Sequence, residues 1–303
     1  MQDLTVVIVN YNTREDLARC LETIPGAAVG LACRTIVVDN ASSDGSAEMA
    51  RERFPWATVM VTDHNGGYAY ANNVGLREAG FGEGGEPPRY ALLLNPDTLL
   101  PPKALGQMVG FMDAHPNIGV SGPKLVRRDG TLDKACRRSF PTPAVSFYRI
   151  VGLSKLFPRS RVFGQYNLTF LDEDQEADVD AVVGAFMLMR GQALAQAGLL
   201  DETFFMYGED IDLCYRIKQH GWRIVYHPQV TVLHVKGASS RKASDRAITA
   251  FYDAMRIFHD KHYRTQTPAP INWAIDGGVT LLKWMALTRN RLRPAERKHV
   301  ASA

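Results

Sequence analysis

The sequence is poor in cysteine, and it lacks both a long apolar run and a strong excess of either charge. Its four cysteines stand far apart with no C-x-x-C pair, so we expect free thiols in a reducing cytosol. No run of about 18 uncharged apolar residues occurs, and the N-terminus does not resemble a signal peptide. We therefore expect a cytoplasmic protein without a membrane span. The formal net charge of +3 gives no electrostatic support for binding to nucleic acid.

Two common phosphate-binding motifs are also missing. No G-x-G-x-x-G follows the first apolar run, and no G-x-x-x-x-G-K-[ST] occurs anywhere. A dinucleotide-binding Rossmann domain and a P-loop NTPase are therefore both poorly supported.

What the chain does contain is an alternation of short apolar runs and helical patterns over its first hundred residues. The runs are typical of strands buried on both faces of a parallel sheet, and each is followed by a polar cluster. In an open parallel sheet the carboxyl ends of the strands lie along one crevice, where helix N-termini favour an anion such as a diphosphate. We predict an α/β fold whose strands include residues 5–9, 35–38, 58–62 and 90–94.

The remaining two thirds of the chain are predicted with less regularity. Residues 136–178 lose clear periodicity and are interpreted as an insertion, ordered only in part, of the kind that serves as a lid or binding loop. We predict a catalytic domain over 1–240 and a C-terminal helical region over 241–303. The further expected elements are helices at 103–115, 191–197, 244–262 and 271–292, and strands at 118–121, 179–189, 222–226 and 230–235.

The stretch 204–216, F-F-M-Y-G-E-D-I-D-L-C-Y-R, is the strongest candidate for chemistry. Its three carboxylates, Glu209, Asp210 and Asp212, open a helix directly behind an aromatic and methionine-containing segment that includes Tyr207. A carboxylate placed beside such a wall can act as a general base towards a bound substrate. The alternative is that the acids only stabilise the start of the helix through its macrodipole.

Six motifs, in their expected order between about residues 4 and 262, together resemble the family 2 inverting glycosyltransferases, most closely the bacterial rhamnosyltransferase-like branch. The resemblance implies a GT-A fold with a mostly parallel nucleotide-binding sheet flanked by helices, a nucleotide-sugar donor and a divalent metal. The motifs are V-V-I-V-N-Y-N-T, V-V-D-N-A-S-S-D-G-S, N-G-G-Y-A-Y-A-N-N, L-L-L-N-P-D-T, F-F-M-Y-G-E-D-I-D-L-C-Y-R and H-V-K-G-A-S-S.

On the donor side, the resemblance implies that Asp39 accepts a hydrogen bond from the pyrimidine base, with Asn10 or Tyr11 flanking the base. Alone, Asp39 is equally compatible with a turn at the end of a strand. Glycine at 66 and 67 would let the backbone approach ribose or diphosphate; the alternative is a turn before a helix. The remaining donor candidates are Asn65, Asn95, Asp180, which also fits a plain strand end, and Lys236, which lies in a loop that could close over the diphosphate.

For the metal, the resemblance places Asn95-Pro96-Asp97 where the family has an Asp-x-Asp motif. Mg²⁺ or Mn²⁺ needs oxygen ligands there to neutralise the leaving diphosphate. With Asn95 in the first position, Asp97 is the one full-charge ligand, and the diphosphate must supply much of the coordination. His234 is the candidate for a further ligand, and it is also compatible with a purely structural role.

On the acceptor side, the resemblance makes Asp210 the catalytic base, which takes the proton of an acceptor hydroxyl as that oxygen attacks the anomeric carbon. Glu209 or Asp212 would orient the acceptor, and Tyr207 lies beside them. Arg137 and Arg138 suit a phosphate on either substrate; the alternative is an exposed basic loop.

The function implied is transfer of a sugar to a saccharide or polyprenol-diphosphate-linked acceptor in cell-surface polysaccharide or O-antigen synthesis. The rhamnosyl branch implies dTDP-L-rhamnose as donor, although UDP-linked hexoses remain open. Two alternatives stay open: a sugar nucleotidyltransferase of related fold, and a carbohydrate-binding domain without catalysis. Asn10-Tyr11-Asn12 argues against the first, because a nucleotidyltransferase would carry a glycine-rich basic phosphate motif at that position.

The C-terminal helix and its basic tail form the last candidate. Trp284 lies in an amphipathic pattern that leads into a cluster of arginines from Arg289 onward. That pattern is typical of an interfacial helix drawn to anionic lipid, which would place the protein peripherally on the inner face of the plasma membrane. The alternative is packing on the catalytic domain or on a second subunit of a homodimer.

Overall fold

The structure is a computed structural model, and it describes residues 2–82, 85–235 and 245–292. The first hundred residues alternate between strands and helices as the sequence predicts, and the four strands run parallel to one another. Every residue of the strand Leu4–Asn10 is buried, which explains its nearly continuous apolar sequence. The elements are β1 (Leu4–Asn10), α1 (Arg14–Ala27), β2 (Cys33–Asp39), α2 (Ser46–Arg53), β3 (Thr58–Val61), α3 (Tyr68–Glu78) and β4 (Tyr90–Leu94).

The second half extends the same sheet. Strand β8 lies antiparallel between β4 and β6, so the strand direction reverses at this point of an otherwise mostly parallel sheet. The elements are β5 (Thr98–Leu99), α4 (Ala104–Ala114), β6 (Ile118–Val126), β7 (Ala177–Asp178), β8 (Phe186–Arg190), α7 (Gly191–Ala197), α8 (Glu209–Gln219) and β9 (Arg223–His234).

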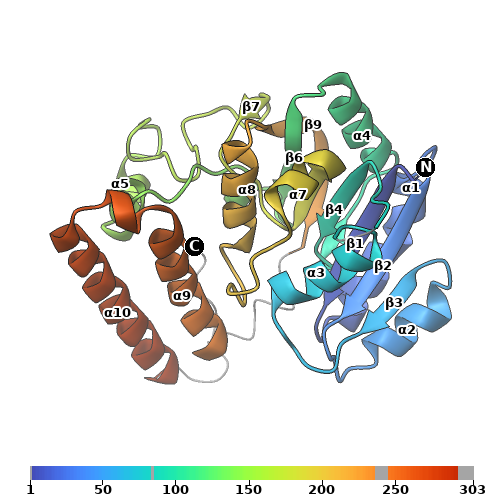
Figure 1. Ribbon diagram of the computed structural model, residues 1–303, viewed down its shortest axis with the longest axis horizontal. Coiled ribbons are helices and arrows are strands. Elements are labelled where there is room, and N and C mark those ends of the chain that lie inside the picture. Colours follow the sequence, from blue (N-terminus) through green and yellow to red (C-terminus); the bar gives the residue numbers. More distant parts are fainter. Residues whose placement is uncertain (1, 83–84, 236–244, 293–303) are drawn as a thin grey trace.

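Together these strands form one nine-stranded sheet in the order β3-β2-β1-β4-β8-β6-β9-β5, with β7 paired to β9. The sheet occupies the centre and right of Figure 1, flanked by helices. The predicted fold class is therefore confirmed: an α/β fold with a central, mostly parallel sheet.

Two predicted strand regions differ from the structure. Residues 222–226 and 230–235 belong largely to one strand, β9, whose pairing with β6 jumps from His227 to Thr231. Pro228 lies in this irregularity because proline has no N–H to give to the ladder. Of the strand expected at 179–189, only the part from Phe186 forms β8, and the residues before it run irregularly towards α8.

The insertion contains more local structure than its sequence pattern suggests. The Thr142 hydroxyl accepts a hydrogen bond from the Val145 N–H (3.3 Å) and caps the first helix. At the base of the insertion, the Arg137 guanidinium donates to the carbonyls of Leu171 (2.8 Å) and Asp172 (2.5 Å). These bonds join the two ends of the segment. Its elements are η1 (Lys134–Cys136), α5 (Pro143–Ile150) and α6 (Leu153–Leu156).

The C-terminal helices form a hairpin at the left of Figure 1, comprising α9 (Asp245–His262), η2 (Arg264–Gln266) and α10 (Ala269–Leu292). Lys283 pairs with Asp253 (2.8 Å), and Arg264 pairs with Asp276 (2.9 Å). Within the described ranges, no helix is both long and apolar enough to cross a membrane. All four cysteines are free thiols, as expected. The proposed boundary between 240 and 241 lies within the range that the structure does not describe and stays a prediction.

Candidate active site

The polar clusters after β1 and β2 meet side by side. Parallel pairing sets Asn10 opposite Asp39, and the Asn10 amide donates to one Asp39 oxygen at 2.9 Å. The Ser42 N–H donates to the other oxygen at 2.8 Å. Asp39 is 1% exposed, whereas Tyr11 is 47% exposed at the rim. The carboxylate is thus held in a defined orientation at the carboxyl end of the sheet.

Asn40, which the sequence reasoning missed, connects the second polar cluster to the third. Its amide nitrogen donates to the Asn65 side chain (3.0 Å) and to the Gly67 carbonyl (3.1 Å). Its amide oxygen accepts from the Gly66 N–H at 3.2 Å. Its position directly after Asp39, in the same polar cluster, could have identified Asn40 as a site residue from the sequence.

Gly67 allows a close approach between the third cluster and the aromatic stretch before α8. Its φ is +96°, and a Cβ there would lie 2.3 Å from the Phe205 carbonyl oxygen. That oxygen also accepts the Tyr68 N–H at 2.7 Å. The partner of this close approach in the structure is Phe205; the role of the glycines towards ribose or diphosphate stays a prediction.

Asp97 and His234 are neighbours because β5 pairs with the end of β9. One Asp97 oxygen lies 3.3 Å from Nε2 of His234, and Nδ1 of His234 hydrogen-bonds with Asp133 at 2.8 Å. Burial lowers the pKa of His234, but the hydrogen bonds with Asp133 and Asp97 outweigh it and raise the pKa to about 9. Asp133 was missed, since 101 residues separate it from His234 and no spacing in the sequence links them.

These residues fit a divalent metal that also takes ligands from the substrate. No cluster of three or more His, Cys, Asp or Glu suited to a metal occurs among the residues that the structure describes. Asp97 and His234 together offer one oxygen and one nitrogen. A histidine whose other nitrogen is held by a carboxylate is the usual arrangement around a metal ligand. Mg²⁺ commonly binds through one or two carboxylates together with substrate phosphates.

Asp210 is held by three groups at the start of α8. One oxygen accepts from the Arg138 guanidinium (2.6 Å) and from the Gly184 N–H (3.0 Å). The other oxygen accepts from the Ile211 N–H at 2.8 Å. The irregular path of residues 179–185 is what brings Gly184 to this position.

The turn into α8 is unusual. Tyr207 and Gly208 have φ values of +70° and +85°, so two consecutive residues adopt the left-handed conformation. That conformation costs energy for tyrosine and is found preferentially at functional sites. The turn places Glu209 and Asp210 together in the first helical turn.

Glu209 lies beside Asp210 and is 6% exposed, and its Oε2 atom has no hydrogen-bond partner. Burial and the neighbouring Asp210 charge raise the pKa of Glu209 to about 8. Tyr68, also missed, donates its hydroxyl to the Gly184 carbonyl at 2.9 Å. Burial and the charges of Glu209 and Asp210 raise the pKa of Tyr68 well above its usual value. The site therefore combines one anchored carboxylate with a neighbouring one whose pKa is raised by burial.

Asp212 and Asp180 have protein partners of their own. Asp212 is fully buried and accepts from Arg216 on its own helix, and from Lys261 and His262 on α9, each at 2.8 Å. Burial opposes ionisation, but these partners lower the pKa of Asp212 to about 2. Asp180 pairs with Lys218 at 2.6 Å. These contacts, like those of Arg137, fasten elements together, and the binding roles of all three residues stay predictions.

Arg149 of α5 is a cation that the sequence reasoning missed. Its guanidinium lies 4.1 Å from the centre of the Tyr166 ring, and its Nη1 atom is buried without a hydrogen-bond partner. Burial and the positive charge of Arg138 lower the pKa of Arg149, although Tyr166 opposes them. A buried guanidinium without a carboxylate partner is a candidate for binding an anion.

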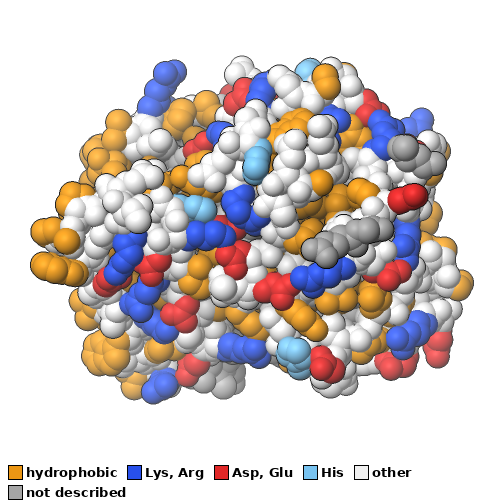
Figure 2. All heavy atoms as spheres, in the orientation of Figure 1, with side chains coloured by type: hydrophobic (Ala, Val, Ile, Leu, Met, Phe, Trp, Pro, Cys, Tyr) orange, Lys and Arg blue, Asp and Glu red, His pale blue; other side chains and the backbone are white. Residues whose placement is uncertain are grey.

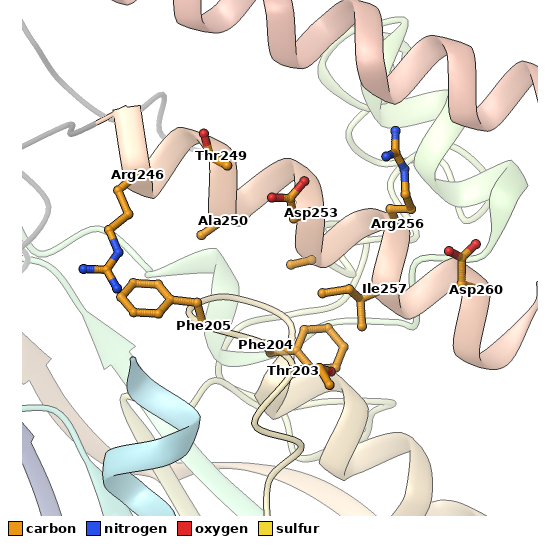
Figure 3. Close-up of a pocket in the computed structure, with 11 residues that line it drawn as sticks. Thr203, Phe204, Phe205, Arg246, Thr249, Ala250, Asp253, Arg256, Ile257 and Asp260 are labelled. Carbon is orange, nitrogen blue, oxygen red and sulfur yellow. The ribbon is translucent and has the colours of Figure 1, made fainter. Parts of the chain in front are cut away.

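A cavity of about 470 Å³ lies between α9 and the aromatic stretch before α8 (Figure 3). Arg246 reaches across one end, with its guanidinium 3.8 Å from the centre of the Phe205 ring. Its lining includes neither Glu209 nor Asp210. It therefore lies beside the carboxylates rather than around them.

Comparison with known proteins identifies the family of this chain. The model of a family described as glycosyltransferase-like family 2 matches residues 2–254. The chain belongs to glycosyltransferase family 2. The resemblance carried by the six motifs is confirmed, and a non-enzymatic or nucleotidyltransferase interpretation is not favoured.

Curated proteins that are similar to this chain include two rhamnosyltransferases. The N-acetylglucosaminyl-diphospho-decaprenol L-rhamnosyltransferase of Mycobacterium tuberculosis is 28% identical over 299 residues, covering 97% of this chain and 96% of that protein. Rhamnosyltransferase WbbL of Escherichia coli K12 is 27% identical over 162 residues, covering 52% of this chain and 56% of that protein.

Among solved structures, the mannosyltransferase PcManGT of Pyrobaculum calidifontis, in complex with GDP-Man and Mn²⁺, matches with a TM-score of 0.54 at 18% identity. The match covers 97% of this chain and 79% of that one. At this identity the likeness concerns the fold, and it supports the GT-A assignment.

For this family 2 member, the predicted site residues fall into three neighbouring groups. Asn10 and Asp39 are joined by a hydrogen bond, Asp97 lies beside His234, and Arg138 holds Asp210. Asn95 joins the second group through its carbonyl, which accepts from the Thr98 hydroxyl at 2.7 Å. Lys236 lies outside the described residues.

Proposed function

We propose that this chain is an inverting L-rhamnosyltransferase that uses dTDP-L-rhamnose and acts on a saccharide or polyprenol-diphosphate-linked acceptor in cell-surface polysaccharide synthesis. The observation that carries the proposal is the anchored carboxylate of Asp210 behind the left-handed turn at Tyr207. The similarity of the whole chain to a rhamnosyltransferase of Mycobacterium tuberculosis supports the choice of sugar.

In this proposal Asp210 accepts the proton of the acceptor hydroxyl while that oxygen forms a bond to the anomeric carbon of the donor. The bond between that carbon and the diphosphate oxygen breaks, its electron pair leaves with the nucleoside diphosphate, and the anomeric configuration inverts. The bonds to Arg138 and Gly184 keep the Asp210 carboxylate oriented. Glu209, whose pKa is raised by burial and by the neighbouring Asp210 charge, is suited in its protonated form to donate a hydrogen bond to the acceptor sugar.

The nucleotide would lie along the carboxyl ends of β1 and β2. We assign Asp39 to the base, with Asn10 orienting that carboxylate and exposed Tyr11 at the rim. The loop with Asn65, Gly66 and Gly67 is assigned to the ribose or diphosphate. Asp180 towards the donor sugar and Lys236 towards the diphosphate complete the proposed donor contacts.

A divalent cation, Mg²⁺ or Mn²⁺, would be held by Asp97 and His234. When bound, it neutralises charge on the diphosphate and so favours departure of the nucleotide. Asp133 orients His234 for that task through the bond at Nδ1. Calorimetry with donor, with and without Mn²⁺, tests this assignment: Asp97→Ala should remove the difference between the two titrations.

On the acceptor side, Tyr207, Asp212, Arg137 and Arg138 remain our proposed contacts, direct or through neighbours. Arg149 has a buried Nη1 atom without a hydrogen-bond partner. We therefore add Arg149 as the residue for an acceptor phosphate.

We further propose a cytoplasmic location with peripheral contact to the inner face of the plasma membrane through α10. Trp273 and Trp284 of this helix are 72% and 64% exposed, which suits an interfacial position. Contact with a second copy of the chain is the alternative occupant of that face.

The function is tested by incubating the chain with a panel of nucleotide sugars and a diphosphate-linked saccharide, and by identifying the released nucleotide. Transfer from dTDP-L-rhamnose with release of dTDP is expected. Release of pyrophosphate would indicate a nucleotidyltransferase, and the absence of any turnover across the panel would contradict the proposal.

A further inference from the structure

The part of the insertion that precedes Asp172, together with η1, has an unusual distribution of charge. From Lys134 to Leu171 the sequence has no aspartate or glutamate, whereas it has seven lysines and arginines. Acidic residues resume at once with Asp172 and Glu173. A segment of 38 residues with seven positive and no negative charges is exceptional in a chain whose overall balance is 35 basic to 32 acidic residues.

The same segment exposes large apolar side chains. Leu156 is 69% exposed and Phe147 is 58% exposed, both well above what a packed helix leaves uncovered. Figure 2 shows hydrophobic side chains gathered along the left edge of the molecule, on the side where Figure 1 draws the insertion and α10. The exposed apolar residues of the insertion are Phe147, Ile150, Val151, Leu156, Phe157 and Val162.

Basic side chains are interleaved with these apolar ones. Lys155, Arg159 and Arg161 are exposed, and none of them forms an ion pair with any residue that the structure describes. We call the six apolar and three basic side chains the insertion surface. Apolar and aromatic groups interleaved with unpaired basic groups are the composition of interfacial membrane-binding segments.

We propose that the insertion surface docks on a lipid bilayer that contains anionic headgroups. The apolar side chains enter the boundary between headgroups and acyl chains, and the basic side chains meet lipid phosphates. A two-fold contact between copies of this chain would instead bring the same unbalanced positive charge against itself, because such an interface uses one surface twice. Charge complementarity therefore favours lipid over a second copy.

The insertion surface lies on the same segment as a residue of the proposed active site. The segment that carries it also carries Arg138, which holds Asp210. Tyr166 of the insertion lies against Arg149 of α5, so the helix that exposes Phe147 is also tied to the interior of the insertion. Docking here would bring the active site to the headgroup layer, within reach of an acceptor anchored in the membrane.

The test is flotation of the full chain with vesicles of phosphatidylcholine, with and without phosphatidylglycerol, at low salt and without substrate. The wild type is expected to float with the anionic vesicles and much less with the neutral ones. A triple variant of the insertion surface should partition at least about tenfold less. Its substitutions are Phe147→Ser, Leu156→Ser and Val162→Ser.

A matched control variant replaces three exposed apolar residues elsewhere on the surface: one after α1, one after α2 and one at the end of β3. A second variant replaces three exposed apolar residues of α10. The control should float like the wild type, and all variants should keep the wild-type melting temperature because the residues are exposed. The control substitutions are Val29→Ser, Trp56→Ser and Val61→Ser, and the α10 substitutions are Trp273→Ser, Trp284→Ser and Met285→Ser.

Several outcomes would overturn the proposal. These are a wild type that does not float, an insertion variant that floats like the wild type, and a loss confined to the α10 variant. Sedimentation in which the insertion substitutions dissociate an oligomer would assign the surface to a second copy instead. Turnover on a short, water-soluble acceptor should be unchanged in the insertion variant, and this separates loss of docking from failure of the proposed chemistry.

Discussion

Asp210 is held by Arg138 and by two main-chain N–H groups, so its carboxylate has little freedom to rotate. A fixed, ionised carboxylate beside a reacting hydroxyl is what a concerted displacement requires. The Asp212 carboxylate on the same helix is equally buried but points its charge at Arg216, Lys261 and His262. The two carboxylates on α8 therefore differ in their partners, and only Asp210 is proposed as the base.

Asp210→Asn is therefore expected to lower kcat by about 10²–10⁴-fold, the usual contribution of a general base. Donor affinity measured by calorimetry should stay within about threefold, because the donor contacts are proposed on other residues. The melting temperature must be measured alongside, since Arg138 loses its buried partner. A variant that folds and keeps most of its turnover would remove Asp210 from the role of base.

Glu209 provides a test that depends on pH. Its pKa is raised from 4.5 to about 8, so between these values the folded chain retains a proton that the unfolded chain releases. Stability must then fall as the pH rises through that window. Glu209→Gln cannot ionise, and its free energy of unfolding relative to wild type should increase between pH 5 and pH 9, by about 2 kcal/mol or more.

Urea unfolding at the two pH values measures this difference. The exposed Glu22 serves as control, and Glu22→Gln should show the same difference from wild type at both pH values. Equal differences for Glu209→Gln at both pH values would mean that Glu209 ionises normally.

Arg149 is tested through its effect on KM. A lost hydrogen bond to a charged group costs about 1.5–3 kcal/mol, so Arg149→Gln should raise KM for a diphosphate-linked acceptor about tenfold or more. Little change is expected in kcat or with a phosphate-free acceptor. Arg159→Gln, an exposed arginine of the same insertion, is the control on short soluble acceptors. An equal loss on both kinds of acceptor would point to a structural role for Arg149.

For single residues, the sequence predicted the positions of the candidate carboxylates better than it predicted their hydrogen-bond partners. Asp39, Asp97 and Asp210 follow strands or open a helix, so their positions could be predicted from local patterns. Asp133 on His234 and Arg138 on Asp210 join residues that are 101 and 72 positions apart, and nothing local encodes those pairs. No sequence pattern could identify Arg149, because it was selected for a buried Nη1 atom that has no hydrogen-bond partner.

At the scale of elements, the link between α8 and α9 determines how the C-terminal hairpin sits on the catalytic part. Asp212 of α8 is fully buried and accepts from Lys261 and His262 of α9. Since the pKa of Asp212 is lowered to about 2, this link is complete above pH 3.8 and is lost as the pH falls through about 2.

Asp212→Asn should lower the free energy of unfolding by about 3 kcal/mol, because it leaves the part-buried Arg216 and Lys261 without their anion. Asp253→Asn is the matched control on α9, since Asp253 pairs with Lys283 at a half-exposed position and such pairs contribute less than about 1 kcal/mol. Urea unfolding of both variants measures the contrast. Similar small losses in the two variants would show that Asp212 does not hold α9 on α8.

Elements were predictable where a single local pattern decided them. The β-branched runs at β1 and β2 and the apolar run at β4 have no competing interpretation, and their strands form as expected. The sequence pattern predicts only partial order for the insertion, because its order depends on Arg137 bonding to carbonyls 34 and 35 residues later. The apolar residues 179–185 predict a strand, but the N–H of Gly184 is used by Asp210 instead of a neighbouring strand.

At the scale of the whole molecule, parallel pairing sets the carboxyl ends of β1 and β2 side by side, as the rule for open parallel sheets predicts. The same sheet brings residues from the first polar cluster and from the end of β9 to one edge. Membership of family 2 explains why these clusters occur in this order. What the topology could not predict is the outward face of the insertion, because exposure is a property of the assembled molecule.

The anomeric configuration of the product decides whether this chain transfers L-rhamnose with inversion. The full chain is incubated with dTDP-L-rhamnose, Mn²⁺ and a short diphosphate-linked acceptor, and the configuration of the new linkage is determined by NMR. The new linkage is expected to be opposite in configuration to the donor, with one dTDP released for each bond formed. A product with retained configuration, or one in which a different sugar is transferred in preference to rhamnose, would contradict the proposed function.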